Sequence, residues 1–153
     1  MKPKYHQYKQ GLFSPLHPEK YKGNGPCVYR SSYESKLYSW FDLNSNIVEW
    51  SSESIAIPYI SPKDGHIHRY YPDAIIKLRG SDGNIHPYII EIKPKKQTVA
   101  PTNSNRKNPN KLLYEQITYA INTAKWNACK QFCEKNKFKF MIITEDELNS
   151  LKF

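Results

Sequence analysis

Two short runs of alternating residues, 73–79 and 85–93, constrain the fold of this chain more than any other feature. The segment between them, Gly-Ser-Asp-Gly-Asn at 80–84, has the composition of a β-hairpin turn. A hairpin centred on this turn pairs Asp73 directly with Glu91, and facing residues have Cβ atoms about 4.5–5.5 Å apart. The sequence therefore predicts two carboxylates side by side at the open end of one antiparallel hairpin.

Two carboxylates this close repel each other unless something positive lies between them. Oxygen ligands favour a hard cation, so we expect Mg²⁺, with Mn²⁺ as a substitute. Lys93 shares strand parity with Glu91 and would face the same site, able to orient or deprotonate a water molecule or to offset charge on a phosphate. Pro72 suits a strand start and would place Asp73 at a rigid corner. The pattern predicts a metal-dependent site that cuts phosphodiesters.

The remaining elements predict an α/β (α+β) fold in the order α-β-β-β-α-β, with a central mixed sheet of about four to five strands flanked by helices. Ser31 and Glu34 fit a capping box at the start of a helix over 31–43, which by itself is a sufficient structural reason for Glu34. The other predicted elements are strands over 47–50, 54–60, 66–71 and 138–143, a helix over 111–135 with an apolar stripe from Leu113 to Phe132, and a short closing helix capped by Thr144 and Glu147.

A chain of 153 residues is most simply one domain. Prolines and a Gly-Asn-Gly turn predict that residues 1–28 form an irregular basic arm, either disordered or a strap on DNA, ahead of a single domain over 29–153. Three cysteines without a secretory signal favour reduced thiols in a cytosol over a zinc site. No apolar run is long enough for a membrane span, so no membrane partner is expected.

The net charge of +9, together with 12 tyrosines and 3 tryptophans, suits a polyanion such as double-stranded DNA. Residues 94–110 contain no acidic residue and are long for a loop, which indicates either a solvated loop or a DNA clamp. Basic side chains in this loop, and others adjacent to the acidic motifs, are the predicted DNA contacts: Arg30, His68, Arg69, Lys95, Lys96, Arg106, Lys107 and Lys111.

Glu34, Pro72-Asp73 and Glu91-Ile92-Lys93 together resemble the PD-(D/E)XK nuclease superfamily, and the order of elements over 29–144 resembles its restriction-endonuclease-like core. The resemblance implies that Asp73 and Glu91 are direct metal ligands, with the backbone carbonyl of Ile92 as a third. It implies that Lys93 acts on the attacking water and that Glu34 either binds metal through water or holds a second ion. Gln116, on the following helix, would be an accessory residue, as a polar side chain is in some relatives.

Longer stretches, at 18–23, 29–34, 57–59 and 68–73, resemble the head completion nucleases of T-even-type tailed phages. This resemblance implies a DNA endonuclease acting on packaged or terminal DNA as the capsid is finished, with capsid or portal proteins as partners. Cutting both strands would require two sites, supplied by a homodimer or by a second event. The alternatives are a transposon-end endonuclease of the same superfamily, a catalytically idle DNA-end or capsid-binding protein, and an RNA-binding module.

Overall fold

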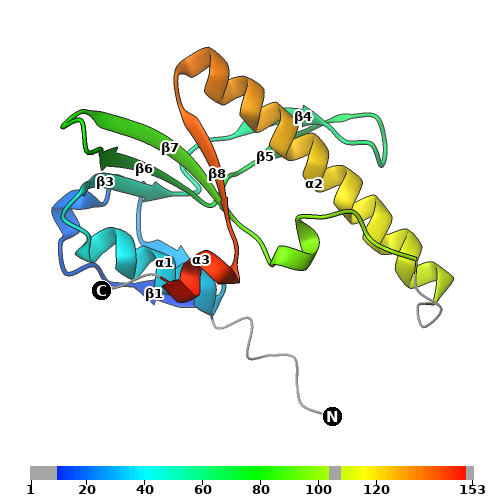
Figure 1. Cartoon of the computed structure of the whole chain (residues 1–153), viewed down its shortest axis with the longest axis horizontal. Helices are drawn as coiled ribbons and strands as arrows, with labels where there is room; N and C mark the ends of the chain where they lie inside the picture. The colour runs from blue at the N-terminus through cyan, green and yellow to red at the C-terminus, as the bar shows by residue number, and fades with distance from the viewer. Residues whose placement is uncertain (1–9, 104–107, 151–153) are drawn as a thin grey trace, which may run out of the picture.

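A four-stranded mixed sheet lies at the centre of the molecule (Figure 1). The computed structural model describes residues 10–103 and 108–150. In spatial order the strands are β3 (Ile47–Ser52), β6 (Ala74–Arg79), β7 (Ile85–Ile92) and β8 (Lys139–Ile143). Strand β6 is antiparallel to both β3 and β7, and β8 runs parallel to β7. The predicted fold class, a mixed sheet flanked by helices, is confirmed.

The β6–β7 hairpin has the predicted register. Ala74 pairs with Ile90, so the next pair outward is Asp73 and Glu91. The turn closes with a 2.8 Å hydrogen bond from the Gly80 amide to the Asn84 carbonyl, and Gly83 has a φ of 80°, which favours glycine. Local turn chemistry thus sets the pairing on which the acidic pair depends.

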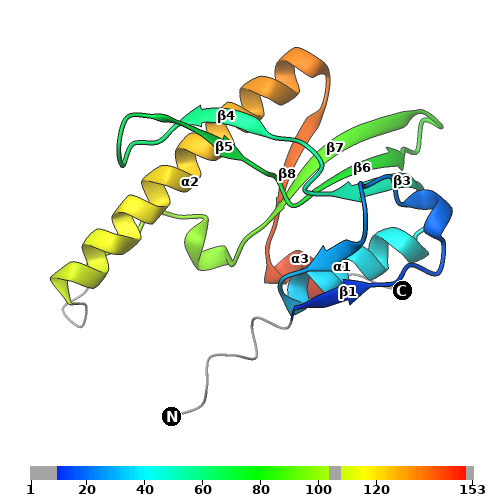
Figure 2. The same ribbon diagram turned by 180° about the vertical axis from the view of Figure 1, so that it is seen from behind.

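Each face of the sheet is covered by different elements. Helices α1 (Ser32–Leu43) and α3 (Glu145–Ser150) lie on one side, where Tyr38, Phe41 and Trp50 are buried with Ile90. Helix α2 (Pro109–Asn136) lies on the other (Figures 1 and 2). The hairpin of β4 (Ile57–Ile60) and β5 (Ile67–Tyr70) leaves the central sheet and packs against α2, forming a second cluster with Ile89, Trp126 and the free thiols of Cys129 and Cys133.

The N-terminal segment is more ordered from residue 10 onward than the sequence predicted. Strands β1 (Gly11–Phe13) and β2 (Cys27–Tyr29) pair antiparallel, and a short 3₁₀ helix, η2 (Pro18–Lys20), lies between them. The Lys20 ammonium donates to the carbonyls of Phe41, Asp42 and Asn44 at 2.6, 2.8 and 2.8 Å, which satisfies groups that the end of α1 leaves open. The prediction of an irregular arm was therefore wrong for this part, and residues 1–9 lie outside the described residues.

Helix α2 packs over only part of its length. Its stripe contacts the second cluster from Ile121 to Phe132, whereas Leu113 and Ile117 are exposed, so the prediction of a core stripe along the whole helix was wrong in its first turns. Between β7 and α2 the chain makes a 3₁₀ turn, η3 (Lys95–Gln97), and an extended loop. In the part of the chain that the structure describes, no helix is both long and apolar enough to span a membrane.

Candidate active site

Asp73 lies at the corner between β5 and β6. Pro72 is fully buried there, and the Asp73 carbonyl accepts a 3.2 Å hydrogen bond from the amide of Glu53. One oxygen of the Asp73 carboxylate, Oδ2, accepts the backbone N–H of Ile92 at 2.7 Å. The carboxylate is thus held against the end of β7, beside Glu91.

Glu91 is only 6% exposed and lies on the α2 side of the sheet, with the same strand parity as the buried Ile89. The Tyr70 hydroxyl donates a hydrogen bond to its Oε2. The Lys93 ammonium lies 3.7 Å from its Oε1. Lys93 therefore shares the face of Glu91, as its position two residues along the strand predicts.

The electrostatics of the pair favour a bound cation. Burial, and after it the charge of Glu91, raises the pKa of Asp73 well above its ordinary value. Burial also raises the pKa of Glu91, against the opposing effects of the Tyr70 hydrogen bond and the Lys93 charge. Two neighbouring carboxylates, one buried and one half-buried, that resist ionisation together present hard oxygen donors, which fits a divalent metal of the Mg²⁺ or Mn²⁺ type better than zinc.

Glu34 stands at the edge of this pair. Its amide donates to the Ser31 hydroxyl at 3.1 Å, so Ser31 caps α1 as the sequence predicts. Its carboxylate accepts the amide of Arg30 at 2.7 Å, one residue before the N-cap amide that the capping box predicts. Its charge also contributes to raising the pKa of Asp73. Over residues 10–103 and 108–150, no group of three or more His, Cys, Asp or Glu side chains is placed to hold one metal ion together. A role for Glu34 through water is compatible with this geometry.

Two site residues, Tyr70 and Lys125, were missed from the sequence. The Lys125 ammonium lies 5.8 Å from the ring centroids of both Tyr59 and Tyr70. Burial, followed by the charge of Lys93, lowers its pKa, while Glu91 and Asp73 act in the opposite direction. A signal existed in the sequence, because Lys125 occurs among inward-facing positions of α2 that are otherwise apolar or uncharged.

The predicted DNA contacts are in different environments. Three of them form ion pairs: Arg30 with Glu53 at 3.2 Å, His68 with Asp64 at 2.8 Å, and Lys95 with Asp146 at 3.0 Å. Arg69, Lys96 and Lys111 are exposed, whereas Arg106 and Lys107 lie outside the described residues. Gln116 is exposed on α2, and the side chain of that helix whose charge acts on the acidic pair is Lys125.

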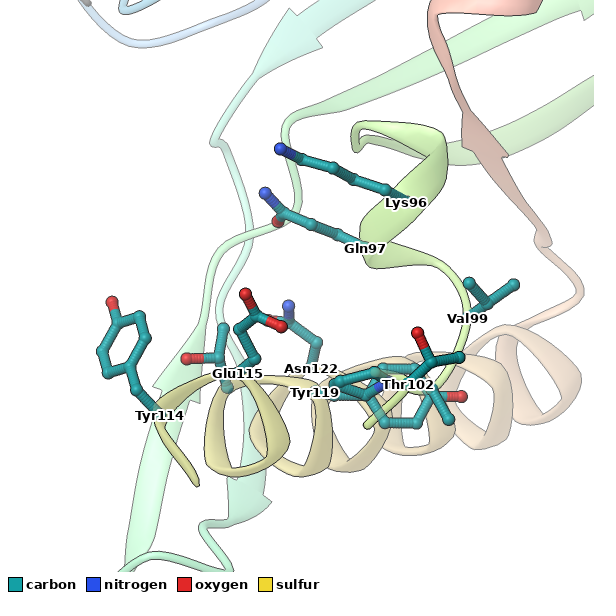
Figure 3. A pocket seen from close by; sticks show the side chains of 11 residues that line it. Lys96, Gln97, Val99, Thr102, Tyr114, Glu115, Tyr119 and Asn122 are labelled. Atoms are coloured by element: carbon teal, nitrogen blue, oxygen red, sulfur yellow. The ribbon is translucent and has the colours of Figure 1, made fainter. Parts of the chain in front are cut away.

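A pocket of about 630 Å³ lies between the first half of α2 and the segment of η3 and the loop after it (Figure 3). Lys96 and Gln97 reach over it from η3, and Glu115 and Asn122 point toward them from α2. Lys96 follows Lys93 by three positions, and Asn122 precedes Lys125 by one helical turn. Each of these two lining residues is thus a near neighbour in sequence of a site residue, Lys93 or Lys125, neither of which lines the pocket itself.

The fold and the acidic pair define a nuclease of the restriction-endonuclease-like class. The model of the TnsA-like endonuclease N-terminal family matches residues 44–145, and the chain belongs to this family. It is also similar to the Head completion nuclease of Enterobacteria phage T4, with 36% identity over 147 residues, 94% of this chain and 95% of the phage protein. Both resemblances inferred from the sequence are thereby confirmed. The family match contains Asp73, Glu91 and Lys93 but begins after Glu34.

Proposed function

We propose that this nuclease is a metal-dependent DNA endonuclease that hydrolyses phosphodiester bonds in packaged or terminal DNA while a phage capsid is completed. The observation that carries the proposal is the pair of half-buried Asp73 and buried Glu91, whose pKa values are both raised and whose charges a divalent cation would offset. The basic chain, with net charge +9, supports a polyanionic substrate. The phage relative supports the biological setting.

The proposed roles follow from the positions of the side chains. Asp73 and Glu91 hold the metal, with the Ile92 carbonyl as a third ligand and Glu34 acting through a water molecule. Mg²⁺ is the proposed ion and Mn²⁺ its substitute; when bound, it stabilises negative charge on the phosphate and lowers the pKa of a bound water. Lys93 orients or deprotonates the attacking water, and Tyr70 holds one Glu91 oxygen in place.

Plasmid nicking tests this proposal. Supercoiled DNA is incubated with the protein and Mg²⁺, Mn²⁺ or EDTA, beside Asp73→Asn and Lys93→Ala. We expect metal-dependent nicking by the wild type and its loss in both variants, with Gln131→Ala, an exposed amide on α2, as the matched control. Absence of nicking by the wild type at every metal and salt concentration would sink the enzyme proposal, and equal nicking by the two variants would sink the site assignment.

Two alternative functions predict different outcomes in the same experiment. A catalytically idle DNA-end or capsid-binding protein would shift DNA in a gel and cut none of it. A transposon-end endonuclease, which the TnsA-like family description favours, would leave a plasmid without transposon ends intact. Cutting of such a plasmid therefore supports the head completion role.

The proposed head completion role also predicts the partners of the protein and its location. We propose double-stranded DNA as the substrate, capsid or portal proteins as contacts, and the host-cell cytoplasm and then the virion as the location. A homodimer would supply the two sites that cutting both strands requires. Sedimentation with and without DNA tests the last point: a monomer in both conditions, with linear product formed in one event, would contradict it.

A further inference from the structure

The pocket beside the acidic pair contains a buried amide that lacks a partner. Asn122 is 6% exposed, lines the pocket and points into it (Figure 3). With the residues that the structure describes, its side chain forms no hydrogen bond. Its polar atoms open into the pocket and are available to a ligand there. The pocket therefore suits a ligand that offers hydrogen-bond donors and acceptors to an amide.

The other lining groups narrow the class of ligand. Tyr114 is 70% exposed at the mouth, and Tyr119 lies half-buried on the same helix, so aromatic faces are available for stacking. Lys96 supplies a positive charge at the rim, where a phosphate would remain. Nucleobases combine a flat stacking face, amino groups and ring acceptors, and they are joined to a phosphate.

The volume of the pocket also distinguishes a single nucleotide from a duplex as its ligand. A volume of about 630 Å³ lies within the range of roughly 300–1,000 Å³ typical of pockets that enclose small molecules. A nucleotide fits such a volume and a duplex does not. An asparagine can bond two edge atoms of one base, and stacking on tyrosine tolerates any base.

We propose that this pocket binds an unpaired base of the DNA strand next to the scissile phosphate, so that the protein prefers DNA with an unpaired nucleotide over continuous duplex. The inference rests on the proposed function because it takes DNA as the ligand. It goes beyond that function by naming the form of DNA that the site selects.

Binding is measured with full-length Asp73→Asn protein, so that the result does not depend on cleavage. The probes are a fluorescent duplex with blunt ends, the same duplex with a short 3′ or 5′ tail, and a tailed duplex whose tail carries abasic sites. We expect one tailed duplex to bind about tenfold more tightly than the blunt duplex, the scale of one base stacked on an aromatic ring. The abasic tail should bind like the blunt end.

Asn122→Leu and Tyr119→Leu, added to the same protein, should remove the preference and leave blunt-end binding unchanged. Gln131→Leu, which makes the same change on the exposed face of α2, should keep it. If Asn122→Leu fails to fold, Gln97→Ala at the exposed rim and Tyr114→Leu carry the same test.

Equal binding of blunt and tailed duplexes would overturn the inference, as would equal binding of base-bearing and abasic tails. An unaltered tail preference in every folded pocket variant would also overturn it and assign the pocket to another ligand, such as a protein segment. A tail preference in a protein whose wild type cuts no DNA would instead contradict the proposed function and leave this inference standing.

Discussion

The carboxylate of Asp73 accepts the backbone N–H of Ile92 at 2.7 Å. This bond joins the start of β6 to the end of β7 and fixes one acid beside the other without a second charge. The arrangement destabilises the metal-free fold, because it places two carboxylates with raised pKa values next to each other. Function and stability should therefore respond to changes at this pair in opposite directions.

Asp73→Asn should abolish nicking and yet stabilise the metal-free protein. Asparagine can still accept the Ile92 amide while it removes one of two repelling charges. We expect nicking to fall by more than the roughly 100-fold that loss of an outer metal partner costs. In EDTA the free energy of unfolding should rise, and Mg²⁺ should raise the melting temperature of the wild type only. A variant destabilised in EDTA would contradict this account.

Tyr70→Phe should weaken both metal binding and cutting by about 10- to 100-fold, because it removes the hydroxyl that orients Glu91. Tyr59→Phe is the matched control, since Tyr59 also lies under Lys125 but donates no hydrogen bond to Glu91. Metal affinity follows from Mg²⁺ titration of thermal stability. Equal losses in the two variants would show that the Tyr70 hydroxyl has no separate role.

Lys125→Met should lower kcat by about tenfold or more, because a half-buried positive charge close to the acidic pair is only partly screened by water. Lys125→Arg should recover part of the activity. Lys130→Met, an exposed change on the same helix, should have no effect. Single-turnover rates at saturating DNA separate an effect on the chemical step from an effect on DNA binding. A change confined to KM would place Lys125 in DNA binding.

Lys20→Met should destabilise the fold by about 1–3 kcal/mol, the scale expected when carbonyls lose a charged donor. Activity below the melting transition should be unchanged, because Lys20 is distant in sequence and packing from the acidic pair. Urea denaturation beside Lys22→Met, which changes an exposed neighbour, measures the difference. Equal midpoints for the two variants would mean that the three carbonyls are satisfied without Lys20.

Lys96→Gln should reduce the slope of log K against log salt by about one phosphate contact, a change of roughly 0.9. Lys95→Gln should change it less, because Lys95 is already paired with Asp146 at 3.0 Å. DNA binding titrated over a range of salt concentrations gives both slopes. If the larger change belongs to Lys95, the ion pair opens on DNA and Lys95 is the contact.

The sequence predicted what depends on neighbouring residues. The hairpin register follows from a local turn, and the cap of α1 follows from Ser31 and Glu34, three residues apart. The features that the sequence did not predict depend on contacts between residues far apart in the chain. Lys20 finds its partners 21 to 24 positions away, and the β4–β5 hairpin leaves the sheet to bring Tyr70 and Lys125 together. No alternation or turn signal in either segment specifies those pairings.

The straight backbone of α2 carries both Asn122 and Lys125, one helical turn apart, a rise of about 4.5 Å. The helix therefore fixes the spacing between Asn122, which lines the pocket, and Lys125, whose charge acts on the acidic pair. If an unpaired base is bound at Asn122 and the phosphate is cut near Lys125, every DNA end that the protein produces would have the same length.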